Sequence, residues 1–314
     1  MGIVSKDKQV SVVIATYNHA HLISRAIRSV LNQTYQNLEL IIVDDGSTDN
    51  TEAVVNSIYD ERIRYIRHEV NRGQPAARNT GIRASKGELI GFLDSDDRWL
   101  PEKLRRQVDK FASASDGTGL VYGGCMVVSE ETGKPMARSL PVIRGHSFKE
   151  MLKVDFVTSP TPLVKRQCFD KAGLFDETFV VGEDWDMWTR IAEHYEFDFV
   201  TEVVAEQFDS RAQMTKDLTK VIQGYLKFIA KYQPCLSENQ AILAHHFKIV
   251  GQMYLVQRDY GMAKRYFVEA ARANPRSVAL YIYLMVARSL PCVYIAVRGL
   301  SIRLRQLRQR LCTD

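Results

Sequence analysis

The chain has 314 residues, 46% of them hydrophobic and 25% charged, which is enough to bury one large core or a core and a small second domain. Its aromatic content of 10% excludes a disordered chain. The net charge of +5 is mild, so by itself it does not distinguish a nucleic acid, an anionic membrane or a phosphorylated substrate as the partner.

Strand and helix patterns alternate through the first third of the chain. Short apolar runs predict buried strands at Val10–Ala15, Leu38–Val43 and Glu88–Leu93, and alternation predicts a half-exposed strand at Arg62–Arg67. Helices are predicted over His19–Leu31, after the Ser-Thr-Asp cluster at residues 47–49, and over Pro75–Ala84. This order predicts a mostly parallel sheet with helices on both faces.

The pattern is mixed in the middle of the chain. Strands are predicted near Leu120–Val128, Pro162–Lys165 and Phe197–Val204, and a helix is predicted over Asp184–His194. Beyond about Thr215 the pattern predicts helices alone. We therefore expect two parts, an α/β domain of residues 1–214 and a helical region of residues 215–314.

Polar clusters follow three of the predicted strands, namely Thr16-Tyr17-Asn18, Asp44-Asp45-Gly46-Ser47 and Asp94-Ser95-Asp96-Asp97. Ligands of such sheets bind at the carboxyl ends of the strands, so three converging clusters predict a site. Asp94 and Asp96 are spaced to point at one cation, and hard oxygen ligands suit Mg²⁺ or Mn²⁺. Each acidic cluster alone also fits a solvated turn or a helix N-cap.

Four segments, in this order, resemble the family 2 glycosyltransferases with the GT-A fold: VSVVIATYNHAHLISRAIRSVLNQTY, LELIIVDDGSTDNT, NRGQPAARNTGIRASKGELIGFLDSDDRWLP and VGEDWDMWTRIAE. The resemblance covers roughly residues 10–215. It implies a GT-A nucleotide-sugar-binding fold, which is Rossmann-like with a mixed, mostly parallel sheet flanked by helices, and the helical pattern beyond Thr215 adds an α-helical C-terminal extension. It also implies an inverting, metal-dependent enzyme that moves a sugar from a nucleotide-sugar, most commonly a UDP-sugar, to an acceptor hydroxyl.

The resemblance assigns roles to matching residues. The donor would be bound by residues at the strand ends and in the "ARN" stretch: Ala15, Thr16, Tyr17, Asp44, Asp45, Arg78 and Asp94. Asp96 would lie closest to a Mg²⁺ or Mn²⁺ that bridges the donor diphosphate, and Asp184 would be the general base. Glu183 and Trp185 would contact the acceptor, and the Trp185 ring would stack on a sugar.

These roles agree with elementary chemistry. A divalent ion stabilises a diphosphate leaving group as a Lewis acid, and a weakly nucleophilic hydroxyl needs a base to take its proton. A free aspartate has a pKa of about 3.9 and is a feeble base. We expect the negative charges of Glu183 and Asp186 to raise the pKa of Asp184.

Two further features qualify the resemblance. Trp188 lies three positions after Trp185, and helix periodicity favours core packing over ligand contact for it. Many relatives carry a histidine in a Tyr-Arg-x-His stretch after the base motif, but here the corresponding residues 206–211 contain none. Arg211 is the candidate replacement as a phosphate partner.

The C-terminal third contains the spacing of one tetratricopeptide repeat, carried by Phe247, Val250, Gly251, Tyr254, Ala263, Phe267 and Pro275. Because stable solenoids need about three repeats, a helical hairpin packed on the catalytic domain is favoured over a partner-binding module. Residues 278–297 are apolar, but Arg288 and Pro291 argue against a membrane span. Beyond them, leucines recur on one helical face and arginines flank them, from Arg298 to Leu311. This pattern fits either an interfacial helix on an anionic membrane or a solvated helix.

The expected location is cytoplasmic, with peripheral contact to the inner face of the cell membrane. Five scattered cysteines without a C-x-x-C pair argue against disulfides and structural zinc, and the first ten residues lack the apolar stretch of a secretion signal. The resemblance implies surface polysaccharide or lipopolysaccharide synthesis with a glycan or lipid-linked acceptor, and no nucleic acid. The alternative function is a non-catalytic sugar-nucleotide-binding or scaffold protein that acts through its helical region.

Overall fold

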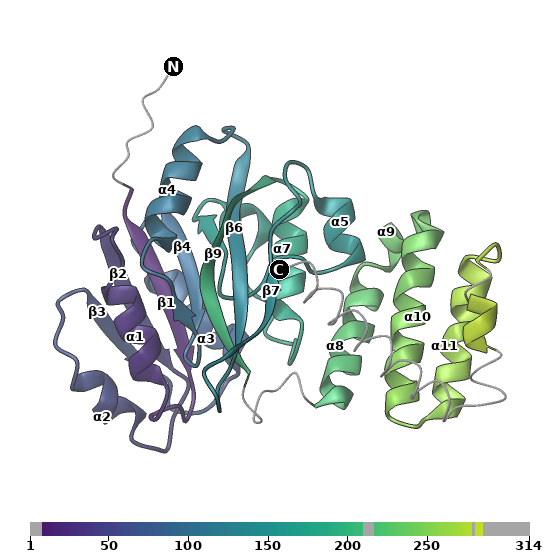
Figure 1. Cartoon of the computed structure of the whole chain (residues 1–314), viewed down its shortest axis with the longest axis horizontal. Coiled ribbons are helices and arrows are strands. Elements are labelled where there is room, and N and C mark those ends of the chain that lie inside the picture. The colour runs from purple at the N-terminus through teal and green to yellow at the C-terminus, as the bar shows by residue number, and fades with distance from the viewer. Residues whose placement is uncertain (1–7, 210–216, 278–279, 285–314) are drawn as a thin grey trace. The chain divides into compact units, whose positions relative to one another are not determined.

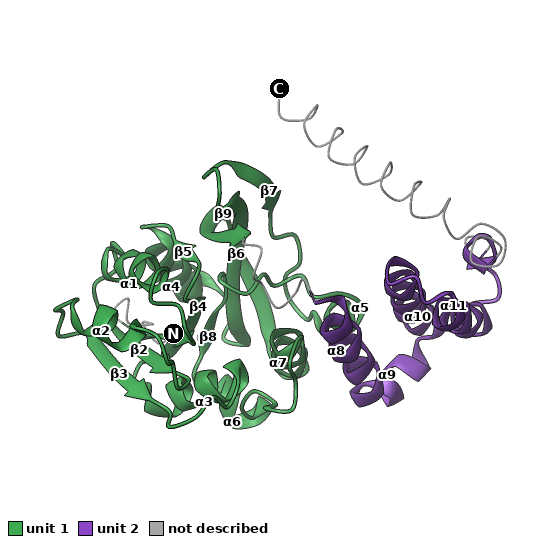
Figure 2. Ribbon diagram, turned by 90° about the horizontal axis from the view of Figure 1, so that it is seen from below, with its two compact units in different colours: residues 1–214 green, residues 215–314 purple. Residues whose placement is uncertain are grey.

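The computed structural model describes residues 8–209, 217–277 and 280–284. The chain divides into two compact units, residues 1–214 and 215–314, and each is described by itself (Figure 2). The strands of the described part all lie in the first unit: β1 Val10–Thr16, β2 Leu38–Asp44, β3 Ile63–Arg67, β4 Leu89–Asp94, β5 Arg98–Trp99, β6 Thr118–Ser129, β7 Pro135–Ser139, β8 Leu163–Lys165 and β9 Glu196–Asp209. Its helices are α1 Ile23–Leu31, α2 Thr51–Asn56, α3 Gln74–Ala84, α4 Lys103–Ser113, α5 Phe148–Lys153, α6 Cys168–Ala172 and α7 Glu183–Ala192.

The described strands form one nine-stranded sheet in the order β3-β2-β1-β4-β8-β6-β9-β5, with β7 paired to β6 (Figure 1). The first four strands of this order are parallel, whereas β8 runs antiparallel to both β4 and β6. Helices cover both faces of the sheet. The predicted fold class, a mixed and mostly parallel sheet flanked by helices, is therefore confirmed.

Alternation along β1 distributes the core between the two faces of the sheet. Val12 and Ile14 belong to the larger core cluster, which also contains the buried side chains of α1 and α4. The intervening side chains face α3, where Gly81 allows close contact: a Cβ there would lie 2.3 Å from Val13 Cγ1. Helices α1 and α4 on one side and α3 on the other therefore hold β1, and this fixes the strand end at which the candidate site begins.

A close contact with Trp99 also fixes the middle of β4. Gly91 has no side chain, and a Cβ at that position would lie 2.8 Å from Cη2 of Trp99. The Trp99 ring is 1% exposed, and its Nε1 donates a 2.7 Å hydrogen bond to the carbonyl of Pro160. The indole therefore links β4 to the loop that precedes β8.

The predicted elements of the first unit are present, with shifted ends. The first helix begins at Ile23 because residues 19–22 form a turn, and its predicted start at His19 was wrong. β9 extends to Asp209, five residues beyond its predicted end. The helix after the "GED" stretch ends at Ala192, two residues before the predicted His194.

The described part of the second unit consists of α8 Leu218–Lys231, α9 Gln233–Glu238, α10 Gln240–Val256, α11 Tyr260–Ala273 and a short helical segment at 280–284. Helices α10 and α11 pack side by side (Figure 1), where Phe267 Cε1 would lie 2.8 Å from a Cβ on Gly251. Tyr254 and Tyr266 stack with ring centroids 5.6 Å apart. The small and aromatic residues of the repeat-like spacing thus form the hairpin contact.

No helix among the residues that the structure describes is long and apolar enough to cross a membrane. The apolar segment near the C-terminus and the arginine-rich stretch that follows lie largely or wholly outside the described residues, as does Arg211.

Candidate active site

Three polar clusters meet at one edge of the sheet, as predicted. In the parallel ladder Thr16 pairs with Asp44, and Ala15 pairs with Asp94, so the three strand ends are level. Parallel strands point their carboxyl ends in one direction, which brings distant stretches of sequence to one place. We call this edge, with the residues that contact it, the carboxyl edge.

Arg78 on α3 is the centre of the carboxyl edge. Its side chain is 2% exposed and is surrounded by acidic groups. Nη2 lies 2.8 Å from Asp94 Oδ1, and Nη1 lies 2.5 Å from Asp184 Oδ1 and 3.2 Å from Glu183 Oε1. The guanidinium also lies 5.4 Å from the ring centroid of Phe175. One buried cation thus joins the D-x-D strand end to the first turn of α7.

The carboxylates around Arg78 have perturbed acidities. Burial raises the pKa of Asp184, and the charge of Asp94 raises it further, whereas Arg78 lowers it. Burial raises the pKa of Glu183 to about 7, with a contribution from the charge of Asp184 and opposition from Arg78. The predicted increase is present, but its predicted cause was wrong: the charge that raises the pKa of Asp184 is that of Asp94, not those of Glu183 and Asp186, and the side chain of Asp186 bonds Arg190.

The two aspartates of the D-x-D pair are in different environments. Asp94 accepts hydrogen bonds from Gln74 Nε2 at 2.7 Å and Ser159 Oγ at 3.2 Å, in addition to its ion pair. Among the described residues, no other side chain donates a hydrogen bond to the carboxylate of Asp96, although the Arg25 guanidinium bonds its backbone carbonyl. Burial and the charge of Asp94 raise the pKa of Asp96, which a nearby cation would oppose.

The donor set fits a weakly held divalent ion. Within the described ranges, no group of three or more His, Cys, Asp or Glu side chains is arranged to hold a metal. Mg²⁺ and Mn²⁺ sites commonly use one or two carboxylates and complete their shell with water and substrate phosphate. An available carboxylate at Asp96 beside Asp94 meets that requirement.

Asp44 and Asp45 are buried and already bonded within the chain. Asp44 accepts hydrogen bonds from the Ser47 backbone at 2.7 Å and from the Tyr65 hydroxyl at 2.6 Å. Asp45 accepts bonds at both oxygens from His68 Nδ1 and from the backbone N–H groups of residues 72 and 73, at 2.7–3.1 Å. A carboxylate has about four acceptor sites, so most of those on Asp45 hold the loop that leads into α3.

The end of β1 offers polar groups of another kind. Thr16 is 3% exposed, and no hydrogen-bond partner of its Oγ1 lies among the described residues. Such buried groups are rare, because an unpaired hydroxyl costs about 1–3 kcal/mol. Tyr17 is 43% exposed, and Ala15 is buried beside Asp94 in the ladder. This strand end therefore has one orphaned hydroxyl next to an accessible aromatic ring.

Residues that no motif marked also belong to this edge. Asp155 has an exposed surface, but many protein atoms surround its carboxyl group and reduce its solvation. This loss of solvation is the larger cause, and the negative charges of Asp184 and Glu183 the smaller one, of a pKa raised to about 8. Ser159, in the same loop, contacts Asp94 and Arg78. Neither residue stands in a recognisable pattern. The sequence shows that residue 155 is acidic, but it does not show which residues lie beside it in the fold.

The tryptophans of α7 are both in the core. Trp188 is 0% exposed, as predicted. Trp185 is 6% exposed, and its Nε1 donates a 2.6 Å hydrogen bond to the carbonyl of Met151 in α5. The expectation that Trp185 offers a stacking platform to a sugar is not supported, because its ring is covered by protein. Glu183 is also buried, and its carboxylate contacts Arg78.

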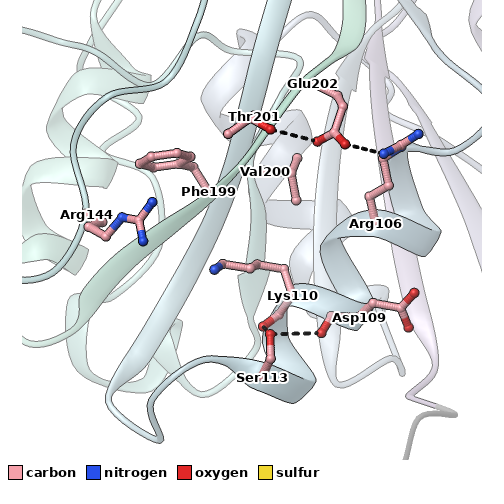
Figure 3. A pocket seen from close by; sticks show the side chains of 9 residues that line it. All are labelled: Arg106, Asp109, Lys110, Ser113, Arg144, Phe199, Val200, Thr201 and Glu202. Carbon is pink, nitrogen blue, oxygen red and sulfur yellow. Dashed lines mark hydrogen bonds and ion pairs between the residues drawn. The ribbon is translucent and has the colours of Figure 1, made fainter.

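A cavity of about 450 Å³ lies elsewhere, between α4 and β9 (Figure 3). Two of its cations are paired with carboxylates: Arg106 bonds Glu202, and Lys110 lies 2.9 Å from Asp198. The guanidinium of Arg144 lies 4.5 Å from the ring centroid of Phe199. None of the residues that line this cavity belongs to the carboxyl edge, so it is not the candidate active site.

Comparison with known proteins identifies the family. The sequence model described as Glycosyl transferase family 2 matches residues 11–173, which is more than half of the chain. An uncharacterized glycosyltransferase of Rickettsia typhi is 30% identical over 243 residues, which cover 74% of each chain. The chain therefore belongs to glycosyl transferase family 2, and the predicted family is confirmed.

Other relatives match over part of their length. The chain spans 31% of the length of an uncharacterized glycosyltransferase of Rickettsia felis, to which it is 34% identical over 193 residues. It is 33% identical over 187 residues to the E. coli UDP-Glc:alpha-D-GlcNAc-diphosphoundecaprenol beta-1,3-glucosyltransferase WfgD, covering 59% of this chain and 70% of WfgD.

A solved structure supports the fold. The mannosyltransferase PcManGT from Pyrobaculum calidifontis, in complex with GDP-Man and Mn²⁺, superposes with a TM-score of 0.60 at 21% identity. The match covers 96% of this chain and 85% of PcManGT. The likeness confirms the GT-A fold.

Proposed function

We propose that this protein transfers a sugar from a nucleotide-sugar donor to an acceptor hydroxyl, with metal assistance and inversion at the anomeric carbon. The observation that carries the proposal is the ion network of Arg78. It joins Asp94 of the D-x-D pair to Asp184, although the two are 90 positions apart in the sequence. Residues 1–214 are proposed as the catalytic domain and residues 215–314 as a helical extension.

The donor is proposed to lie along the carboxyl edge. The orphaned hydroxyl of Thr16 and the exposed ring of Tyr17 provide a polar and an aromatic contact for a nucleoside. Asp45 holds the backbone of the loop before α3, and Asp44 holds the turn that follows β2. Ala15 and Asp94 stand next to each other on the neighbouring strands.

Asp96, with Asp94, is proposed to hold Mg²⁺ or Mn²⁺. A bound divalent ion would supply Lewis-acid stabilisation of the departing diphosphate. The chain itself contributes the position of these carboxylates, because the Trp99 indole packs on Gly91 within β4 and the Ser159 hydroxyl bonds Asp94 at the end of that strand. PcManGT is described with Mn²⁺ and a nucleotide-sugar, which supports this choice of cofactor.

Asp184 is proposed as the general base. It accepts the proton of the acceptor hydroxyl, whose oxygen attacks the anomeric carbon from the face opposite the diphosphate. The bond between the anomeric carbon and the phosphate oxygen breaks, and the diphosphate leaves with the electron pair. Burial strengthens Asp184 as a base by raising its pKa, while Arg78 orients the carboxylate and keeps it ionised. Glu183, which shares Arg78, is proposed to support this arrangement near the acceptor.

The acceptor is proposed to be a glycan or a lipid-linked sugar in polysaccharide synthesis. The name of the relative WfgD gives UDP-Glc as its donor and a diphosphoundecaprenol-linked sugar as its acceptor. Another relative, 35% identical over 201 residues, is the succinoglycan biosynthesis protein ExoO of Rhizobium meliloti. A lipid-linked acceptor would place the enzyme at the cytoplasmic face of the membrane.

The proposal is tested by incubating the protein with a panel of UDP- and GDP-sugars and Mg²⁺ or Mn²⁺, and by measuring release of the nucleoside diphosphate. We expect one donor to be hydrolysed slowly without acceptor, and the Asp96→Asn variant to lose this activity. Asp109→Asn, an exposed carboxylate beside the cavity of Figure 3, is the matched control. Binding of a donor without turnover in any combination would favour a non-catalytic role and contradict the proposal.

A further inference from the structure

A second charged site lies at the opposite edge of the sheet. Lys8 precedes β1, and Gly87 and Glu88 precede β4, so these residues stand at the amino ends of parallel strands. Lys165 ends the antiparallel β8 and pairs with Leu89 at the start of β4. We call this the amino edge. It contains a cleft of about 390 Å³ lined by Lys8, Lys86, Gly87, Glu88, Lys165, Arg166, Gln167 and Asp170.

The cations of this cleft exceed its acidic partners. Lys8 forms an ion pair with Glu88 at 3.4 Å. Among the described residues, no carboxylate lies within ion-pair distance of Lys86, Lys165 or Arg166. This arrangement differs from the cavity of Figure 3, in which Arg106 and Lys110 each contact a carboxylate. The amino-edge cleft therefore carries unbalanced positive charge.

Two of these cations, Lys165 and Arg166, are held by backbone carbonyls. The pKa of Lys165 is lowered by burial and by the positive charge of Lys8, although its Nζ donates a 3.2 Å hydrogen bond to the carbonyl of Asp116. Arg166 is fixed by a 2.8 Å hydrogen bond from its Nε to the carbonyl of Gly87, yet its Nη2 is buried with no partner among the described residues. An unpaired guanidinium nitrogen is costly, and an oxyanion would satisfy it.

The floor of the cleft is rigid. A Cβ at Gly87 would lie 2.6 Å from the carbonyl of Gln9 and 2.6 Å from the amide of Ser11, so only glycine allows this backbone approach. The Gly87 amide donates to the Ser11 hydroxyl at 2.8 Å. The carbonyl that holds Arg166 is thus fixed by the β-sheet, and the site does not depend on a mobile loop.

We propose that the amino-edge cleft binds a phosphate group, held by Lys86, Lys165 and Arg166. Phosphate fits because its several oxygens accept charge-assisted hydrogen bonds from lysine and arginine together. The group belongs to a soluble phosphate compound or to a phospholipid headgroup, which present the same chemistry. The site is separate from the carboxyl edge, and the proposal does not depend on the proposed transferase activity.

The test is a titration of the full chain with inorganic phosphate, without divalent ions, followed by NMR at the Gly87 amide and the Arg166 Nε–H. Leaving out the metal keeps phosphate away from the carboxyl edge, where carboxylates repel it. We expect saturable shifts, with affinity at least about tenfold weaker in the double variant Lys86→Gln/Lys165→Gln. Arg166 is left intact because its side chain bonds the backbone of Gly87.

Lys110→Gln is the matched control, since it removes one lysine charge from the cavity of Figure 3. A parallel experiment measures sedimentation with vesicles of phosphatidylglycerol against vesicles of phosphatidylcholine. If the double variant loses binding to phosphatidylglycerol vesicles, a lipid headgroup is the source of the phosphate group. If the double variant loses phosphate binding and neither protein binds vesicles, the source is a soluble compound. Absence of any binding, or equal weakening in Lys110→Gln, overturns the proposal.

Discussion

The two edges of the sheet carry charges of opposite sign, and they differ in how far those charges are paired with counter-charges. At the carboxyl edge, carboxylates gather on one buried arginine, and Arg78 contacts three of them. At the amino edge, lysines and an arginine line a cleft with too few carboxylates nearby. The mild net charge of +5 conceals both excesses, because they have opposite sign. Charge averaged over a chain therefore says little about its sites, and the local balance says much more.

The largest effect is expected for Asp184, and it separates a role in proton transfer from a role in donor binding. Asp184→Asn removes the proposed base but keeps its shape, so sugar transfer should fall by about 10²–10⁴-fold while donor affinity changes little. Steady-state rates and donor titration measure the two quantities separately. Lys165→Gln at the amino edge should leave transfer unchanged. Near-normal turnover in Asp184→Asn would exclude this residue as the base.

Removal of the central cation should destabilise the carboxyl edge strongly. Arg78→Gln leaves three carboxylates without a counter-charge, which should lower the free energy of unfolding by about 3–5 kcal/mol. The loss should be larger at pH 8 than at pH 5, where the carboxylates take up protons. Urea unfolding at both pH values measures it. Arg106→Gln, which breaks a partly exposed pair, should cost no more than about 1 kcal/mol, and equal losses would refute the contrast.

Asp155 provides a test through pH. Its pKa of about 8 in the folded protein lies above the ordinary value of about 3.9, so the folded state binds more protons between these limits. Its contribution to stability therefore falls as pH rises from about 4 to 8. Asp155→Asn should be more stable than the wild type at pH 8 and equal to it near pH 4. Unfolding curves across this range check the slope, with Asp170→Asn at the amino edge as the control.

The smallest effect is expected at the amino edge. Lys165→Gln removes a cation that is repelled by Lys8, so stability at pH 7 should rise slightly, by at most about 0.5 kcal/mol. The gain should shrink at high salt, because ions screen repulsion between accessible charges. Thermal unfolding at low and high sodium chloride measures this difference. A loss of stability that is the same at both salt concentrations would show that Lys165 acts through packing.

The sequence predicted the parallel half of the fold well, because its strands are buried apolar runs such as Val10–Ala15 that end in polar clusters. It missed β7, whose residues are all exposed and show no alternation. It also missed α4, in which Lys103 and Gln107 are buried at positions where an apolar residue is expected. Periodicity detects apolar burial, and it fails where the core contains bonded polar groups.

The candidate site was predictable only where it lies in a motif. Asp94, Asp96 and Asp184 could be named because they follow strands or match a family pattern. Asp155 and Ser159 could not, since their place depends on how the loop before β8 folds back onto β4. The burial of Trp185 was also hidden, because it depends on a carbonyl 34 residues away, in α5.

The contact between Gly91 and Trp99 means that a substitution at one of these positions constrains which residues the other can accept. Neither residue belongs to the acidic cluster, yet the indole fills the space that a side chain at position 91 would need and donates a hydrogen bond to the carbonyl of Pro160, the residue after Ser159. An alanine at 91 would displace the indole, and with it the loop that supports the D-x-D pair. The two positions are therefore expected to change together, with a bulkier residue at one accompanied by a smaller residue at the other.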